Sequence, residues 1–187
     1  MKIIISIISI TLFLASCQPS QDNSAQMTFE KNSQTVLAFL EDWQNEEVDY
    51  DQYFAEDFWM RPTSFGSKDS VGLEDMMSSD KWNWAEFDHK KPEDMVLLPG
   101  VNAETKEVDG SVRYYGIWTI TRPTSKNTEA LTAKIKVYQS YDFNEDGKIT
   151  FLQTYGDWGG MRDYLEDNKP HEEHEDMDEM QDVDEAM

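Results

Sequence analysis

A strict alternation of apolar and polar residues over positions 131–143 is the clearest structural signal in the chain. Its mostly apolar face consists of Leu131, Ala133, Ile135, Val137, Gln139, Tyr141 and Phe143. A repeat of two residues is typical of a β-strand with one buried face. The next four residues, Asn144-Glu145-Asp146-Gly147, favour a type I turn closed by a left-handed glycine bulge. The sequence therefore predicts one long β-hairpin over residues 131–158.

The glycine bulge decides which residues of the second strand face inward. Because it adds one residue, the face of Val137 and Tyr141 is predicted to continue through Ile149, Phe151, Gln153, Tyr155 and Asp157. Apolar walls with a few convergent polar groups are typical of a small-molecule site. We therefore expect this face to be a pocket wall that presents Trp118, Gln139, Tyr141, Gln153, Tyr155 and Asp157 to a ligand.

Helical spacing marks the beginning of the domain. From Phe29 onward an apolar face is formed by Val36, Phe39, Leu40 and Trp43, and either Asn32 or Ser33 is expected to cap the helix. Short helices are also predicted around Tyr53, over residues 71–77, and over residues 161–165.

Several further strands are predicted between these helices. They cover residues 58–61, 95–98 and 111–122, and the last has an inward face of Val112, Tyr114, Trp118 and Ile120. Trp82, Trp84 and Phe87 also alternate as in a strand. His89 is flanked by Asp88 and Lys90, so we expect its side chain to be in solvent.

The N-terminal residues indicate where in the cell the protein is located. Lys2 is followed by an apolar run over residues 3–14, which has the length of a signal peptide and is too short to span a membrane. The run ends in Leu-Ala-Ser-Cys17, which resembles the lipobox of bacterial lipoproteins. The resemblance implies that Cys17 is lipidated, with palmitate among its acyl chains, and that the protein is anchored in the bacterial cell envelope, in the outer membrane rather than the inner. The alternative is an ordinary signal peptide with a chance cysteine.

Composition divides the chain into four parts and excludes some partners. We expect a signal peptide over residues 1–16, a flexible tether over 17–28, one domain over 29–166 and a disordered acidic tail over 167–187. The formal net charge of −22 argues against nucleic acid as a partner, because little here would neutralise phosphates. Cys17 is the only cysteine, which excludes a disulfide within one chain.

Three stretches together resemble one known superfamily. They are TVLAFLEDW, YDQYFAEDFWM and DFNEDGKITFLQTYGDWGGM. They resemble the nuclear transport factor 2-like superfamily and, within it, the SnoaL-like group, over residues 29–165. The motif Tyr155-Gly156-Asp157 departs from the aromatic-aromatic-Asp ending of many members. The resemblance implies an α+β fold in which a curved antiparallel sheet packs on helices as a cone with one pocket. Members include polyketide cyclases, ketosteroid isomerase-type enzymes, dehydratases and non-catalytic binding domains.

Asp157 is the strongest candidate for a catalytic residue. A carboxylate desolvated beside Tyr155 and aromatic walls would have a raised pKa and could act as a general base next to a carbonyl group. The simpler alternative is that Asp157 caps the turn at Gly159-Gly160 or pairs with an arginine.

Metal binding is weighed at two places and favoured at neither. Residues 142–149 match the first eight positions of a calcium loop, but the twelfth position holds Gln153 and both flanks are strand-like. A bulged hairpin turn explains the same residues. His171 and His174 lie in the acidic tail, which is expected to be a solvated segment. We therefore expect no metal and no cofactor.

Three functions remain open at the level of sequence. The first is a lipid-anchored domain that binds a small apolar or aromatic ligand without turning it over. The second is a cyclase- or isomerase-type enzyme with Asp157 as its base. The third is an interaction module that forms a homodimer through the sheet, with Tyr138 and Trp158 exposed on its outer face.

Overall fold

The structure is a computed structural model that describes residues 24–125 and 129–167. Within them the chain forms four helices and one mixed, curved seven-stranded sheet, in the strand order β2-β1-β7-β6-β5-β3, with β4 also paired to β5. The strands are β1 (Phe54–Arg61), β2 (Val71–Gly72), β3 (Asp88–Lys90), β4 (Val96–Val101), β5 (Val108–Arg122), β6 (Leu131–Phe143) and β7 (Ile149–Tyr155). The helices are α1 (Ser24–Gln44), α2 (Tyr50–Tyr53), α3 (Leu73–Glu86) and α4 (Trp158–Asp167).

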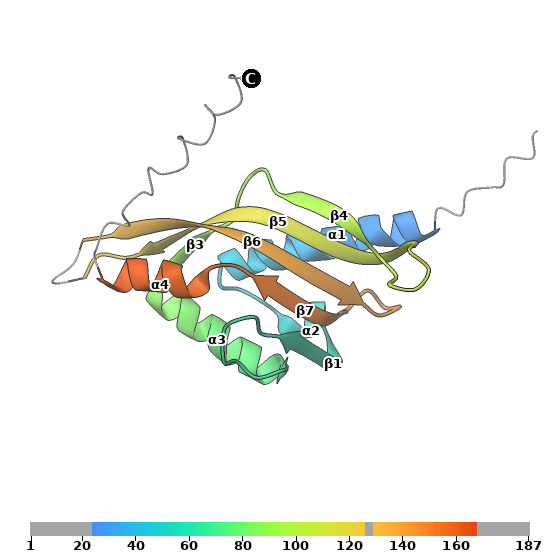
Figure 1. Cartoon of the computed structure of the whole chain (residues 1–187), viewed down its shortest axis with the longest axis horizontal. Helices are drawn as coiled ribbons and strands as arrows, with labels where there is room; N and C mark the ends of the chain where they lie inside the picture. Colours follow the sequence, from blue (N-terminus) through green and yellow to red (C-terminus); the bar gives the residue numbers. More distant parts are fainter. Residues whose placement is uncertain (1–23, 126–128, 168–187) are drawn as a thin grey trace, which may run out of the picture.

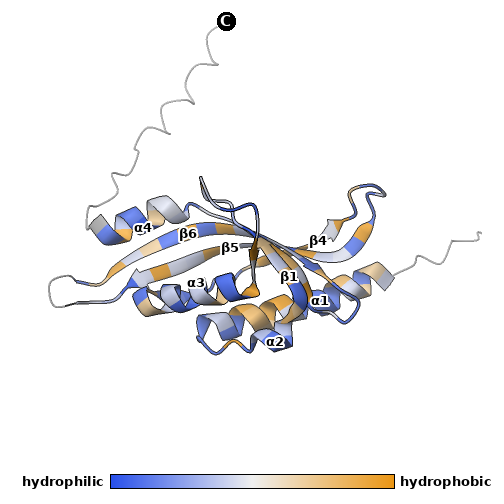
Figure 2. Cartoon of the chain, turned by 90° about the horizontal axis from the view of Figure 1, so that it is seen from below, coloured by the Kyte–Doolittle hydropathy of each residue, from blue (hydrophilic) through white to orange (hydrophobic). Residues whose placement is uncertain are grey.

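The long strands β5 and β6 are the centre of the sheet, and α1 and α3 lie on the same side of it (Figure 1). Hydrophobic and hydrophilic residues alternate along these elements (Figure 2). The core lies between the concave face of the sheet and the helices, and includes Val36, Phe39, Leu40, Val112, Tyr114, Ile120 and Tyr141. The α+β fold is therefore confirmed. None of the helices in the described residues is long and apolar enough to cross a membrane.

The central hairpin forms as predicted at its turn. Gly147 has a φ of 80°, in the left-handed region. Its amide donates a hydrogen bond to the carbonyl of Asn144 at 3.0 Å, and the amide of Asn144 donates to the carbonyl of Lys148 at 3.0 Å. The predicted faces of β6 are also confirmed, since Ile135, Val137 and Tyr141 are buried.

The predicted register of β7 is wrong from Phe151 onward. Phe143 pairs with Ile149, whereas the preceding Asp142 pairs with Phe151, so Thr150 is an extra residue in β7. This second bulge reverses the faces. Leu152 and Thr154 point to the concave side, and the odd-numbered residues 151, 153 and 155 lie on the outer face.

Other elements differ from the expectation in their limits. β1 pairs with β7 in parallel, so the sheet is mixed. α3 runs on to Glu86, through the segment where Trp82 and Trp84 were predicted to be in a strand. α1 begins at Ser24, inside the expected tether, and Asn32 is therefore buried within the helix instead of capping it. Its Nδ2 donates to the carbonyl of Gly110 at 2.9 Å.

The left-handed turn gives a prediction for stability. Gly147→Ala should lower the free energy of unfolding by about 1 kcal/mol, because a side chain strains a left-handed backbone. Gly159→Ala is the matched control, since Gly159 lies in α4 with nothing within 4 Å of an added Cβ. Chemical denaturation of both variants tests this, and an unchanged midpoint for Gly147→Ala would contradict the turn geometry.

Candidate functional site

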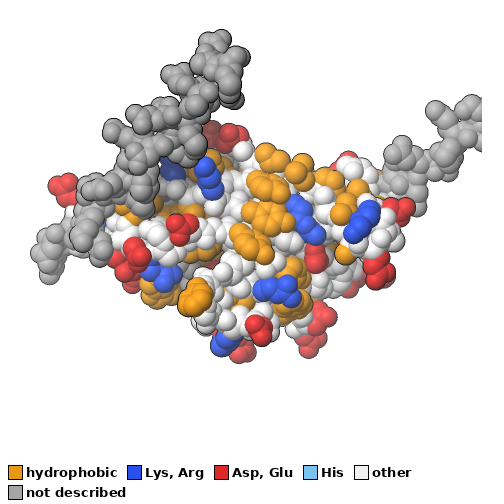
Figure 3. Space-filling model, viewed as in Figure 1, with side chains coloured by type: hydrophobic (Ala, Val, Ile, Leu, Met, Phe, Trp, Pro, Cys, Tyr) orange, Lys and Arg blue, Asp and Glu red, His pale blue; other side chains and the backbone are white. Residues whose placement is uncertain are grey.

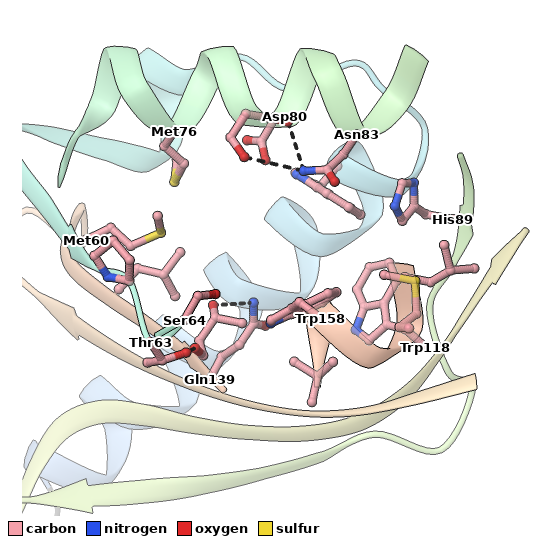
Figure 4. A pocket seen from close by; sticks show the side chains of 18 of the residues that line it. Met60, Thr63, Ser64, Met76, Asp80, Asn83, His89, Trp118, Gln139 and Trp158 are labelled. Atoms are coloured by element: carbon pink, nitrogen blue, oxygen red, sulfur yellow. Dashed lines mark hydrogen bonds between the residues drawn. The ribbon is translucent and has the colours of Figure 1, made fainter. Parts of the chain in front are cut away.

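A cavity of about 280 Å³ lies between α3 and the concave face of the sheet. In Figure 4, Met76, Asp80 and Asn83 project into it from α3, while Thr63, Ser64 and Gln139 lie on the opposite side. α1 and α4 complete the wall. Aromatic rings provide much of the apolar lining, namely Phe39, Trp43, Phe87, Trp118 and Trp158. The residues meet from all parts of the chain, so only the folded domain contains this site.

The polar groups on the sheet side are bound to one another. The amide of Gln139 donates from Nε2 to the hydroxyl of Thr154 at 3.2 Å, and its Oε1 accepts from the hydroxyl of Tyr141 at 2.7 Å. The hydroxyl of Thr63 donates to the carbonyl of Thr154 at 2.6 Å. These bonds satisfy the buried polar groups within the protein, so this side of the cavity is a fixed surface.

On the helix side, Asp80 is a carboxylate that is only 8% exposed. The hydroxyl of Tyr50 donates to its Oδ2 at 2.8 Å, and Trp43 also hydrogen-bonds to it. Burial raises the pKa of Asp80, while these two hydrogen bonds oppose the rise by favouring the charged form. None of the salt bridges between described residues involves Asp80.

His89 lines the same cavity as Asp80. The prediction that its side chain is in solvent is wrong. It pairs with Ile120 of β5, a buried residue of the concave face, and its ring packs edge-on against Trp43 with centroids 4.7 Å apart. Its Nδ1 is buried and has no hydrogen-bond partner. Burial lowers the pKa of His89 to about 4, against the opposing effects of Asp88 and of a hydrogen bond to the backbone of Phe87. The imidazole is therefore neutral near pH 7.

The structure brings only part of the predicted site together. Trp118 and Gln139 line the cavity, and Tyr141 lies fully buried behind Gln139, to which it donates its hydrogen bond. Gln153 and Tyr155 lie on the outer face and do not line the cavity, because the bulge at Thr150 reverses that part of β7. The prediction that they form the pocket wall is wrong.

Asp157 lies outside the cavity as well. Its side chain is exposed, and its Oδ1 accepts a hydrogen bond from the amide of Gly160 at 3.0 Å. This is the helix-capping alternative, at the start of α4. An exposed cap carboxylate is not desolvated, so the geometry expected for a general base at Asp157 is absent.

The outer face of the sheet has an aromatic row of its own. Tyr115 and Tyr138 pair across β5 and β6 with ring centroids 4.9 Å apart, and Tyr155 follows at 5.8 Å from Tyr138. Figure 3 shows hydrophobic side chains gathered at the middle of the face seen there. Trp158, the second aromatic residue expected on this face, lines the cavity instead. Homodimerisation through the sheet stays a prediction, which the mass of the protein in solution would test.

The loop that matches a calcium motif is occupied by hairpin contacts. The Oδ1 of Asn144 accepts a hydrogen bond from the amide of Lys148 at 2.9 Å, and Asp142 forms a salt bridge with Arg113 at 3.2 Å. Within residues 24–125 and 129–167, no three His, Cys, Asp or Glu residues come together as metal ligands.

Comparisons with known proteins identify the fold. No protein-family model and no curated protein matches the sequence. Among solved structures, a phenazine biosynthesis-related protein from Pseudomonas aeruginosa has a TM-score of 0.55 at 12% identity, over 86% of this chain and 96% of that one. A SnoaL-like polyketide cyclase from Jannaschia sp. CCS1 has a TM-score of 0.52 at 12% identity, over 73% and 92%.

A third similar structure is a nuclear transport factor 2-like protein from Burkholderia xenovorans LB400. Its TM-score is 0.51 at 14% identity, over 73% of this chain and 96% of that one. The chain therefore has the nuclear transport factor 2-like fold that its sequence resembles. At such low identity, the likeness concerns the fold alone.

The half-buried imidazole of His89 gives a prediction for the effect of pH on stability. On acidification the unfolded chain takes up a proton near pH 6.5, whereas the folded chain takes it up only near pH 4. The stability that depends on neutral His89 is thus complete above pH 6.5 and is lost as the pH falls towards 4. The shift corresponds to at most about 3 kcal/mol.

His89→Gln should remove this contribution, so the free energy of unfolding should fall less steeply between pH 6.5 and 4 than in the wild type. Denaturant titrations at a series of pH values measure the free energy of unfolding of both proteins. The carboxylates are the same in both, so their contribution cancels when one curve is subtracted from the other. Parallel curves for the two proteins would show that His89 is not buried in the neutral form.

Proposed function

We propose that this domain binds a small molecule with an apolar or aromatic body in the cavity between α3 and the sheet, without turning it over. The observation that carries this proposal is the cavity itself, which is about 280 Å³ in volume and is lined by five Phe and Trp side chains, further apolar residues and ten polar or charged residues. Pockets for small molecules have this composition.

The size of the cavity sets the scale of the ligand. An apolar protein cavity of about 150 Å³ is known to bind benzene. A volume of about 280 Å³ therefore fits a molecule of roughly two rings. Solved structures with this fold include proteins described as SnoaL-like polyketide cyclases, which supports a role in binding small molecules.

We infer binding rather than turnover from the state of the ionisable groups in the wall. Asp80 accepts hydrogen bonds from Tyr50 and Trp43, and both stabilise its charged form, which makes the carboxylate a weaker base for a substrate proton. Asp157, the general base expected in the enzyme alternative, caps α4 outside the cavity. For the enzyme alternative, Asp80 and His89 are the carboxyl and imidazole groups that line the cavity and could take part in acid–base chemistry.

Neighbouring residues of β7 provide the test of this proposal. Thr154→Phe should place a ring in the cavity and abolish binding of naphthylmethanol, a neutral two-ring probe. Gln153→Phe, one residue away on the outer face, should leave binding unchanged. Isothermal titration gives the affinities, and unfolding midpoints confirm that both variants fold. Equal binding by both variants would contradict the proposed site.

We also propose that the protein is held in the bacterial cell envelope by a lipidated Cys17, which lies outside the described residues. The support is the lipobox-like sequence that precedes this cysteine. Two or more acyl chains give stable membrane attachment, and a net charge of −22 would not itself attract the protein to anionic lipid.

Cys17→Ser should therefore move the protein from the membrane fraction to the soluble fraction of cells. Mass spectrometry of the wild type should show an acylated Cys17 at the N-terminus of the mature chain. A wild-type protein that is soluble and retains Met1 would contradict the anchor.

A further inference from the structure

The wall of the cavity contains a buried carboxyl group that forms no salt bridge with any cation of the described residues. Asp80 is 8% exposed and belongs to none of the three salt bridges found between described residues. A buried carboxylate is costly unless it is paired or well hydrogen-bonded. Arginine or lysine usually provides such a pair, but in this wall the partners of Asp80 are the neutral groups of Tyr50 and Trp43.

We propose that the ligand of this cavity is an organic cation, a protonated amine on an aromatic or apolar body, and that Asp80 binds its ammonium group. This inference rests on the proposed function of the same cavity. It adds the chemical class of the ligand and the residue that selects it.

The carboxylate has room for such a partner. An ionised carboxylate has about four acceptor positions, and the two donors at Asp80 occupy two of them. Both donors favour the charged form, which an ammonium group requires. Figure 4 shows Asp80 on the cavity side of α3, between Met76 and Asn83.

The surroundings of Asp80 suit a cation. Trp43, which hydrogen-bonds to Asp80, also packs edge-on against Trp118 with centroids 5.3 Å apart, and both rings line the cavity. Faces of aromatic rings attract cations. His89 packs on the same tryptophan and is neutral near pH 7, so it does not repel an ammonium group.

Two arginines also line the cavity, and both lie against rings at its edge. The guanidinium of Arg61 lies over Trp59 and Phe151 of the outer face, at 5.2 and 5.9 Å from their centroids. The guanidinium of Arg162 lies over Trp82 at 4.7 Å. Neither forms a salt bridge with Asp80. The net charge of −22 produces a field that attracts cations to the protein and repels anions.

Three probes with the same naphthalene body test the proposal: naphthylmethylamine as the cation, naphthylmethanol as the neutral compound and naphthoate as the anion. Titration calorimetry at physiological ionic strength screens the distant charges and leaves the contact in the cavity. We expect the wild type to bind the amine roughly tenfold to a hundredfold more tightly than the alcohol, since this is the usual contribution of a hydrogen bond to a charged group. Naphthoate should bind most weakly.

Two variants assign the preference to Asp80. Asp80→Asn should bind the amine and the alcohol about equally. Asp75→Asn removes the same charge from an exposed position of the same helix and should keep the wild-type preference. Tyr50→Phe removes one of the two donors that favour the charged carboxylate, so it should weaken the preference for the amine without abolishing it. The ranking of the three probes on the wild type decides the ligand class even if Asp80→Asn does not fold.

The outcomes separate the two proposals. Equal binding of amine and alcohol by the wild type, or a preference that persists in Asp80→Asn, would overturn the cation inference while leaving the cavity as a binding site. If no probe binds more weakly to Thr154→Phe than to the wild type, the proposed function itself fails. A preference for the amine that is lost only in Asp80→Asn supports both.

Discussion

The pairing of β7 with β6 is the constraint on which the cavity depends. Thr150 is an extra residue in β7, and it places Leu152 and Thr154 on the concave side of the sheet. Thr154 then accepts the hydrogen bond from Gln139, which holds the polar part of the sheet surface in one arrangement. Without this bulge the cavity would contain Gln153 and Tyr155, and the outer aromatic row would lose its last member.

The cavity also depends on α3, which covers this surface and carries the buried Asp80. α3 presents Met76, Asp80 and Asn83 at spacings of four and three residues, so all three project from one face. Asp80 can occupy that face because Tyr50 and Trp43 donate to it from two other helices. The cavity is thus polar on two opposite sides and aromatic between them, which is the arrangement expected for a ligand with a defined orientation.

The fold could be predicted from the sequence because it depends on long, regular patterns of apolar and polar residues. The alternation in β6 and the Asn-x-x-Gly turn gave the hairpin, and with it Gln139 as a residue of the cavity. The bulge at Thr150 has no comparable signal, since Thr is a normal strand residue, and the outward placement of Gln153 and Tyr155 follows from it. The first turns of α3 were predicted within residues 71–77, but its second half was not, because Asp80 and Asn83 interrupt the apolar pattern there. The inward side of His89 could have been predicted, because it lies two residues after the buried Phe87 and the backbone is extended from Phe87 through β3.

Asp157 caps the helix that provides part of the cavity wall, although it does not line the cavity itself. Its Oδ1 accepts the amide of Gly160, and its carbonyl accepts the amide of Met161 at 3.0 Å, so it fixes the point where α4 begins. That point places Trp158 and Met161 in the wall of the cavity. Leu165, which is fully buried, holds the other end of the helix against the core. The motif that first indicated a catalytic base therefore contributes to the cavity through the helix that it starts, and the buried carboxyl group in the wall of the cavity is that of Asp80.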